Sequence, residues 1–189
     1  TGFAEGQAEF TPAPRRAAEA IPALLKLAGL DESPEDLLAE TRSLFHEEMD
    51  SAVHPTPGLF HLLDVLDRRG LPLAVATSSG RSYAERLLGG HGLRGRFHQL
   101  LTAEDVTQGK PHPEIYRKAA ARLGVEPRDM LVLEDSPAGI SAARAAGAIA
   151  VAVPHEHSPI EGLGLADLIV PRLDDPRVIE LLGDRATPR

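Results

Sequence analysis

A chain of 189 residues, 42% of them hydrophobic, is long enough to bury one core and is not expected to be disordered. Its net charge of −8 opposes binding to nucleic acid or to an anionic membrane surface, and no run approaches the roughly 18 consecutive apolar residues of a membrane span. The absence of cysteine excludes a disulfide framework and a thiolate metal site, and the first ten residues do not read as a signal peptide. We therefore expect a soluble, cytoplasmic protein.

The first part of the chain, residues 11–53, is expected to be helical. An apolar, Ala-rich stretch runs from Ala17 to Leu30 and meets a helix-ending glycine at Gly29. A second helix is expected to begin at Ser33, which can cap it, with Pro34 in the first helical position. Its apolar stripe consists of Leu37, Leu38, Thr41, Leu44 and Phe45. Two helices with no strand between them indicate a helical block.

Beyond the proline-rich segment 54–58, the pattern changes to an alternation of helices and strands. The runs expected to be strands are continuous and apolar, which is typical of a parallel sheet buried on both faces. Such sheets place ligand sites beyond the carboxyl ends of their strands. The expected helices are 59–69, 81–89, 113–123, 138–146 and 178–182, and the expected strands are 71–76, 99–101, 130–133, 148–153 and 168–170.

Three of these strand ends have residues suited to phosphate chemistry, and the first is Thr77-Ser78-Ser79-Gly80. Hydroxyl groups and backbone N–H groups lie here between an apolar strand and a helix. A helix amino terminus offers unpaired N–H donors and a partial positive charge, which favour a phosphate. The alternative is that Ser78 and Ser79 are no more than helix caps.

The second strand end is Gly109-Lys110-Pro111-His112-Pro113. The two prolines restrict the backbone around the lysine, and Pro113 is suited to opening a helix. Lys110 would then be a well-placed positive charge for a phosphate or a carboxylate. The alternative is a solvated surface lysine.

The third strand end, with the adjacent acids Glu134 and Asp135, is the most informative of the three. Ionised carboxylates at the end of a buried strand are costly unless they meet a cation or hydrogen-bond donors. Oxygen ligands with room for water and phosphate describe a Mg²⁺ site. The alternative is that Asp135 or Ser136 simply caps the helix that follows. Together, the hydroxyls, the lysine and the acids indicate phosphoryl transfer.

These three segments resemble motifs of the haloacid dehalogenase superfamily, in its phosphatase and phosphosugar-mutase branch with a helical cap. The resemblance runs from about residue 57 to 170, and it implies a partial cap over residues 1–54 and an α/β core over 55–189. It implies that Thr77 and Ser78 hold the phosphate, with Ser79 in the same loop. It further implies that Lys110 neutralises the phosphate and the nucleophile. Metal binding by Asp135, supported by Glu134, completes what the resemblance implies, with Mg²⁺ as the cofactor.

One motif of that family, an Asp-x-Asp at the end of a first, central strand, has no counterpart in this chain. Before residue 57 the only aspartates are Asp31, Asp36 and Asp50, and none has another aspartate two positions later. The resemblance places the nucleophile in that motif. We therefore hypothesise that the chain is part of a longer protein and that the first strand of the sheet is missing.

The expected function is that of a Mg²⁺-dependent hydrolase. It would remove phosphate from a small phosphorylated metabolite, such as a sugar phosphate, through an aspartyl-phosphate, and act as a monomer. The alternatives are a phosphosugar mutase of the same family and a non-catalytic protein that binds phosphate. A nucleotide-binding doubly wound domain is disfavoured because the chain has neither a G-x-G-x-x-G nor a Walker sequence.

Several histidines and arginines receive a plainer interpretation. His54 is expected to be a surface residue near the proline-rich segment, and His155 and His157 are expected to be loop residues, since no third metal ligand is apparent beside them. Arg15 and Arg16 are expected to lie on the solvated side of a helix.

Overall fold

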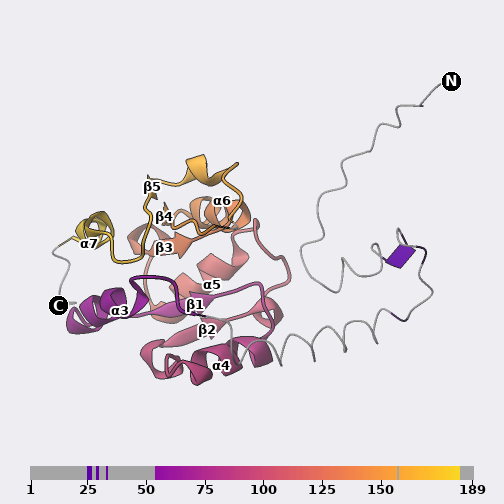
Figure 1. Ribbon diagram of the computed structural model, residues 1–189, viewed down its shortest axis with the longest axis horizontal. Helices are drawn as coiled ribbons and strands as arrows, with labels where there is room; N and C mark the ends of the chain where they lie inside the picture. The colour runs from indigo at the N-terminus through magenta and orange to yellow at the C-terminus, as the bar shows by residue number, and fades with distance from the viewer. Residues whose placement is uncertain (1–24, 27–28, 30–32, 34–53, 157, 184–189) are drawn as a thin grey trace. The chain divides into compact units, whose positions relative to one another are not determined.

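The computed structural model describes residues 25–26, 29, 33, 54–156 and 158–183 (Figure 1). The chain divides into two compact units, Thr1–Glu48 and Met49–Arg189. In the first, residues 25–26 are helical and Gly29 has a φ of 65°, in agreement with a helix that ends near this glycine. The rest of the expected helical block, including Arg15 and Arg16, lies outside the described residues. The cap and its boundary at residue 54 stay predictions.

In the second unit helices and strands alternate as expected (Figure 1). All ten expected elements are present, and most of their ends lie within one or two residues of the expected positions. The helices are α3 (Leu59–Arg68), α4 (Arg81–Gly90), α5 (Glu114–Leu123), α6 (Pro137–Ala146) and α7 (Pro176–Leu181). The strands are β1 (Ala74–Ala76), β2 (Gln99–Leu101), β3 (Leu131–Glu134), β4 (Ile149–Ala152) and β5 (Leu168–Ile169).

Strand β1 is shorter than the apolar run 71–76 that predicts it. Pro72 has no N–H group to donate, and the N–H group of Leu73 donates to Nδ1 of His98 (3.1 Å) instead of to a neighbouring strand. Parallel pairing with β2 therefore begins at Ala74, which lies opposite Gln99.

All strand pairs in the described part of the chain are parallel, which confirms the expected α/β architecture. They form two sheets, β1-β2 and β3-β4-β5, with β4 between β3 and β5. Residues of both β1 and β3 line an apolar cavity of about 450 Å³ between the two sheets. Among the described residues no strand pairs with β1 or β3 on the side of this cavity.

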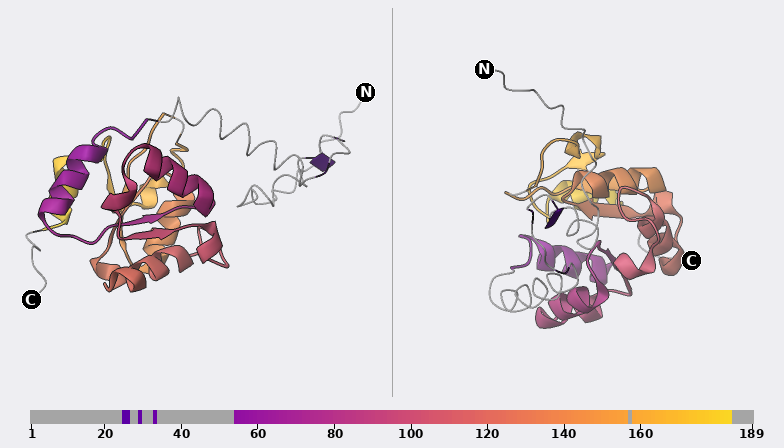
Figure 2. Two further views of the ribbon diagram at one scale, coloured as in Figure 1. Left: turned by 90° about the horizontal axis from the view of Figure 1, so that it is seen from below. Right: turned by 90° about the vertical axis from the view of Figure 1, so that its right-hand side faces the viewer.

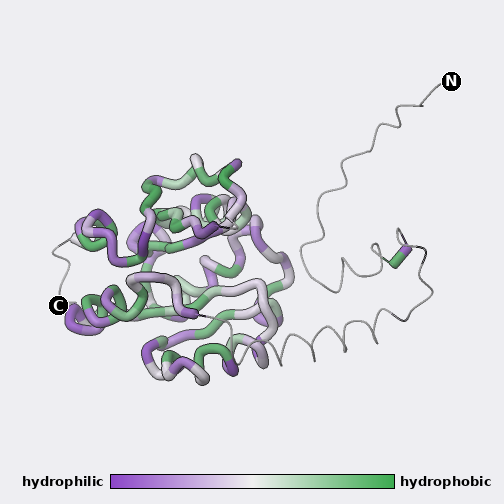
Figure 3. The backbone as a smooth tube through the Cα atoms, viewed as in Figure 1, coloured by the Kyte–Doolittle hydropathy of each residue, from purple (hydrophilic) through white to green (hydrophobic). Residues whose placement is uncertain are grey.

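Helices cover both faces of the sheets (Figures 1 and 2). Helices α5 and α6 pack on one face, together with Ala150 and Ala152 of β4. The neighbouring residues Val151 and Val153 point to the opposite face, where α3 and α7 pack. In Figure 3 these helices alternate between hydrophilic and hydrophobic residues along their turns, as expected for helices with one face on a core. Burial on both faces explains why the strands are continuously apolar.

The carboxyl ends of β1 and β3 lie close together. Nζ of Lys110 donates a hydrogen bond to the carbonyl oxygen of Ala76, the last residue of β1, and also contacts the carboxylate of Glu134, the last residue of β3. The segments that were expected to share chemistry therefore meet at one edge of the sheets.

Candidate functional site

A polar pocket of about 440 Å³ lies beyond the carboxyl ends of β1, β3 and β4. All six residues singled out from the sequence line this pocket, so the expected convergence is observed. The lining residues are Thr56, Ala76, Thr77, Ser78, Ser79, Lys110, Leu133, Glu134, Asp135, Ser136, Val153, His155 and Leu173.

The loop after β1 is ordered by its own hydroxyl group. The backbone N–H of Ser79 donates to Oγ1 of Thr77 (3.1 Å), and the N–H of Thr77 donates to the carbonyl of Leu101 in β2 (3.0 Å). Oγ1 of Thr77 therefore acts as an acceptor inside the loop, and Thr77 also lines the pocket. Ser78 is the most exposed residue of this loop.

At the amino terminus of α4, one backbone N–H group already has an acceptor. The N–H of Arg81, the first residue of α4, donates to both carboxylate oxygens of Glu104 (3.1 Å each). Gly80 precedes this helix, so neither Ser78 nor Ser79 is its cap. A carboxylate already stabilises this helix end, and a phosphate would depend on the loop and its hydroxyl groups.

Lys110 is the buried cation of the pocket. Only 10% of its side chain is exposed, and Nζ donates to the carbonyl of Ala76 (3.0 Å) and pairs with Glu134. The ring of Tyr116 lies beneath the ammonium group, with its centroid 5.0 Å from Nζ, a distance suited to a cation–π interaction. The interpretation of Lys110 as a solvated surface lysine is therefore wrong.

Glu134 is buried among hydrogen-bond donors, with 7% of its side chain exposed. Its carboxylate accepts from Lys110, from the hydroxyl of Tyr116 and from Oγ of Ser136 (3.0 Å). Burial, and then the neighbouring charge of Glu134, raise the pKa of Tyr116, so its phenol stays protonated and donates. These donors satisfy the buried carboxylate without a metal ion. Tyr116 was not predicted from the sequence as part of the site. It lies on the buried side of α5, together with Ile115 and Ala119.

Asp135 is the carboxylate that faces the open part of the pocket, with 54% of its side chain exposed. Oδ2 of Asp135 lies 3.1 Å from Nε2 of His155. His155 lies in the loop after β4, as expected, and also contacts the site, which sequence reasoning did not foresee; His157 lies outside the described residues. Ser136 is the cap of α6, because its Oγ accepts from the N–H of Gly139 (3.1 Å).

The donors in the pocket suit Mg²⁺ only if water and phosphate supply most of its ligands. Asp135 offers carboxylate oxygens to the open pocket, whereas both oxygens of Glu134 already accept hydrogen bonds. The described residues contain no group of three or more His, Asp or Glu side chains placed to hold a metal ion. Mg²⁺ commonly binds through one or two carboxylates with water and substrate phosphate, and Asp135 fits that pattern.

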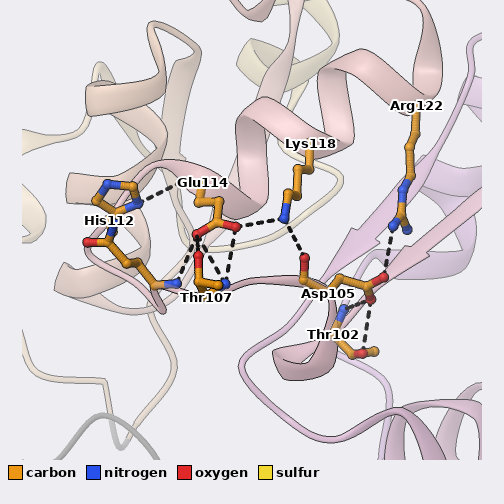
Figure 4. Close-up of polar contacts among 8 residues, drawn as sticks. Thr102, Asp105, Thr107, His112, Glu114, Lys118 and Arg122 are labelled. Carbon is orange, nitrogen blue, oxygen red and sulfur yellow. Dashed lines mark hydrogen bonds and ion pairs between the residues drawn. The ribbon is translucent and has the colours of Figure 1, made fainter.

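A second set of polar contacts joins the loop that precedes α5 to that helix (Figure 4). The carboxylate of Glu114 accepts from the N–H of Thr107 (3.1 Å), the hydroxyl of Thr107 (2.9 Å) and the N–H of Gln108 (2.8 Å). Lys118 also donates to Glu114 (2.7 Å). The bond from Lys118, followed by those from the loop, lowers the pKa of Glu114 to about 2.

Asp105 makes a similar junction at the end of β2. Its carboxylate accepts from Arg81 (2.5 Å), from Arg122 (2.8 Å) and from the N–H of Thr102 (2.8 Å). Burial acts to raise the pKa of Asp105, but the bonds from Arg122 and Thr102 outweigh burial, and the pKa is about 2. Lys118 links the two junctions, because it also donates to the carbonyl of Asp105 (2.8 Å).

Proteins similar to this chain include named phosphatases. A validoxylamine A 7'-phosphate phosphatase of Streptomyces hygroscopicus subsp. limoneus is 41% identical over 130 residues, which cover 69% of this chain and 60% of that protein. A fructose-1-phosphate phosphatase of Escherichia coli strain K12 is 38% identical over 135 residues, and the match covers 69% of each. The chain thus spans less than two thirds of the first of these relatives.

The fold is also similar to that of solved structures. A putative β-phosphoglucomutase from Thermotoga maritima superposes with a TM-score of 0.74 at 26% identity, over 87% of this chain and 77% of that one.

No helix in the described ranges has the length and apolar character needed to cross a membrane.

A family model matches the part of the chain that contains the three motifs. The model of haloacid dehalogenase-like hydrolases matches residues 6–147, which include β1 to α6 and therefore Thr77, Lys110 and Asp135. The match also extends upstream of residue 57, into the segment that the sequence assigns to the cap. This chain belongs to the family of haloacid dehalogenase-like hydrolases.

Proposed function

We propose that this protein binds the phosphate group of a small phosphorylated metabolite in the pocket beyond β1 and β3, and hydrolyses the phosphate ester. The observation that supports this proposal is the convergence of Thr77, Ser78, Lys110 and Asp135 on one pocket. Hydroxyl donors, a buried ammonium and an exposed carboxylate are the groups that bind phosphate directly and through a divalent cation. The relatives named as phosphatases of phosphorylated sugars and related metabolites support the same substrate class.

In this proposal each residue has a distinct role. Thr77 and Ser78 donate their O–H groups to phosphate oxygens, and Ser79 completes the loop. Lys110 places its positive charge against the phosphate from the side of β1. Glu134 pairs with this ammonium group at the carboxyl end of β3 and also accepts a hydrogen bond from Tyr116.

Asp135 and Glu134 are the residues proposed for Mg²⁺, with Asp135 as the direct ligand and Glu134 acting through water. When bound, Mg²⁺ would neutralise phosphate charge and orient the group for in-line transfer. The aspartyl-phosphate route also needs a carboxylate nucleophile. Among the described residues that line the pocket, the only carboxylates are Glu134 and Asp135, and this proposal assigns both of them to Mg²⁺.

Two alternatives remain within the same site. A phosphosugar mutase would return the phosphate to another hydroxyl of the sugar, and the similarity to a putative β-phosphoglucomutase favours this alternative. A phosphate-binding protein without turnover would use the same loop and lysine but release no product.

The experiment that tests the proposal combines binding with turnover. Calorimetric titration of the chain with inorganic phosphate in the presence of Mg²⁺ is expected to give one site, and Lys110→Met is expected to weaken it about 10–100-fold, as for loss of a charge-assisted bond. Fructose 1-phosphate is then offered as substrate, and the products are resolved by phosphorus NMR.

Each outcome separates the candidates. Release of inorganic phosphate supports the hydrolase, and movement of the phosphate to another hydroxyl supports the mutase. Binding of phosphate without any product supports the non-catalytic alternative. Phosphate affinity that is absent, or unchanged by Lys110→Met, overturns the proposed site altogether.

A further inference from the structure

Lys110 lies in the middle of a loop that leaves β2 and returns to α5, and the position of its Cα depends on how that loop is held. A lysine side chain has four rotatable bonds, so its ammonium group is well placed only if the backbone beneath it is fixed. Lys110 is nevertheless 90% covered, and its Nζ keeps two partners on two different strands. A feature that holds this loop therefore also helps to hold the ammonium group.

The contacts of Glu114 supply that feature. Its carboxylate accepts from three donor groups at the beginning of the loop: the N–H and the hydroxyl of Thr107 and the N–H of Gln108. Glu114 itself is the first residue of α5, where the loop ends. The side chain is 16% exposed and closes the two ends of the loop against each other (Figure 4). Thr107 and Gln108 are exposed, so water would compete for their N–H groups without this carboxylate.

We propose that Glu114 is a positioning residue that acts through Lys110: it fixes residues 107–113 so that the ammonium group of Lys110 stays between the ends of β1 and β3. Glu114 itself is absent from the residues that line the pocket. This inference rests on the proposed role of Lys110 in binding phosphate. Substitution of Glu114 would then weaken phosphate binding by displacing the loop backbone, and not by removing a group that contacts phosphate.

The test uses the full chain, inorganic phosphate with Mg²⁺ as the probe, and amide hydrogen exchange. Glu114→Gln keeps the size of the side chain but presents an NH₂ group to the N–H donors of the loop. We expect the exchange rates of the Thr107 and Gln108 amides to rise about 10-fold or more, and phosphate affinity to fall about 3–10-fold. Lys118→Met, which leaves the bonds from Thr107 and Gln108 in place, is expected to have a smaller effect on both quantities.

Glu85→Gln is the matched control. It also removes a carboxylate from an ion pair, with Arg94 (2.7 Å), but on α4 and outside the pocket lining. Phosphate affinity and the exchange of the loop amides are expected to stay unchanged in this variant. Thr107→Val, which removes only the hydroxyl bond to Glu114, provides a milder variant if Glu114→Gln fails to fold, and is expected to change both quantities in the same direction.

The decisive measurement is a double-mutant cycle with Lys110→Met. If Glu114 acts through Lys110, adding Glu114→Gln to Lys110→Met causes no further loss of phosphate affinity. An equal loss in both backgrounds overturns the inference, as does faster amide exchange with unchanged affinity. Should Lys110→Met alone leave the affinity unchanged, the proposed function fails rather than this inference.

Discussion

At the scale of single residues, the pocket is organised around a buried ion pair that has its own hydrogen-bond donors. A buried carboxylate is costly to leave unpaired, and removal of one partner of such a pair is strongly destabilising. Glu134 meets that requirement with Lys110, Tyr116 and Ser136. Gly139 is required beside it, because a Cβ atom at that position would overlap the Glu134 carboxylate.

Substitution Tyr116→Phe is expected to remove the hydroxyl bond to Glu134 while the ring stays beneath Lys110. The free energy of unfolding should fall by about 1.5–3 kcal/mol, the usual contribution of a hydrogen bond to a charged group. Chemical denaturation with urea measures this change. A loss below about 0.5 kcal/mol would show that the hydroxyl is not needed to satisfy Glu134.

The pH dependence of stability is expected to reflect Asp105 and Glu114, whose pKa values are both about 2. In the unfolded chain these groups titrate at about 3.9 and 4.3. Because folding lowers both pKa values, their stabilisation is complete above about pH 5 and is lost as the pH falls from there towards 2. Urea unfolding at a series of pH values is expected to show this fall, and Asp105→Asn should make it less steep. An unchanged slope in that variant would contradict the assignment.

At the scale of secondary-structure elements, the two helices that border the pocket begin in different ways. Helix α6 begins at a serine whose hydroxyl caps it, with Pro137 in its first turn. Helix α4 is preceded by Gly80, which has no side chain to cap it, and the carboxylate of Glu104, from the segment after β2, supplies the acceptor instead. At α4 the acceptor is an anion, which the partial positive charge of a helix amino terminus also favours.

Substitution Ser136→Ala is expected to lower the free energy of unfolding by at least about 0.5–2 kcal/mol, because the N–H of Gly139 loses its acceptor and the carboxylate of Glu134 loses one of its donors. Ser82→Ala, at an exposed position in α4, is the matched control and is expected to change stability by less than about 0.5 kcal/mol. Thermal or urea unfolding of the two variants provides the comparison. Equal effects would show that neither bond of the Ser136 hydroxyl, to Gly139 or to Glu134, contributes to stability in solution.

At the scale of the whole molecule, ligand binding is expected to be coupled to folding. If Asp135 binds Mg²⁺, a concentration ten times the dissociation constant should stabilise the protein by about 1.4 kcal/mol, seen as a rise of a few degrees in the unfolding temperature. Asp135→Asn should abolish the rise. Asp129→Asn, at the opposite end of β3, is the control and should retain it; a rise that survives Asp135→Asn would place the metal elsewhere.

The packing of the whole unit also explains which expectations from the sequence are confirmed. Apolar runs such as 130–133 and 148–153, bounded by Gly124 and Gly147, are local patterns, and local backbone preferences are enough to separate strands from helices. The parallel arrangement follows because the strands are buried on both faces. The meeting of Thr77, Lys110 and Asp135 in one pocket could be expected for the same reason, since parallel strands have their carboxyl ends at one edge.

Contacts between residues that are far apart in the chain could not be predicted from the sequence. Glu134 finds Lys110 24 residues and Tyr116 18 residues before it, and Glu104 reaches Arg81 over 23 residues. None of these pairs follows from spacing along a helix or strand. They depend on the distance between β1 and β3 and on the register of β1 against β2, in which Ala76 lies opposite Leu101.

The sequence by itself therefore determined the order of helices and strands, the parallel sheet and the three polar segments that precede helices, because each depends on a local pattern of apolar and turn-forming residues. Only the tertiary structure decided which of those polar groups are already satisfied. It shows Glu134 buried among donors and α4 already paired with Glu104, and leaves Asp135 facing the pocket. The physical reason is that the cost of burying a charge depends on partners that only the folded chain brings together.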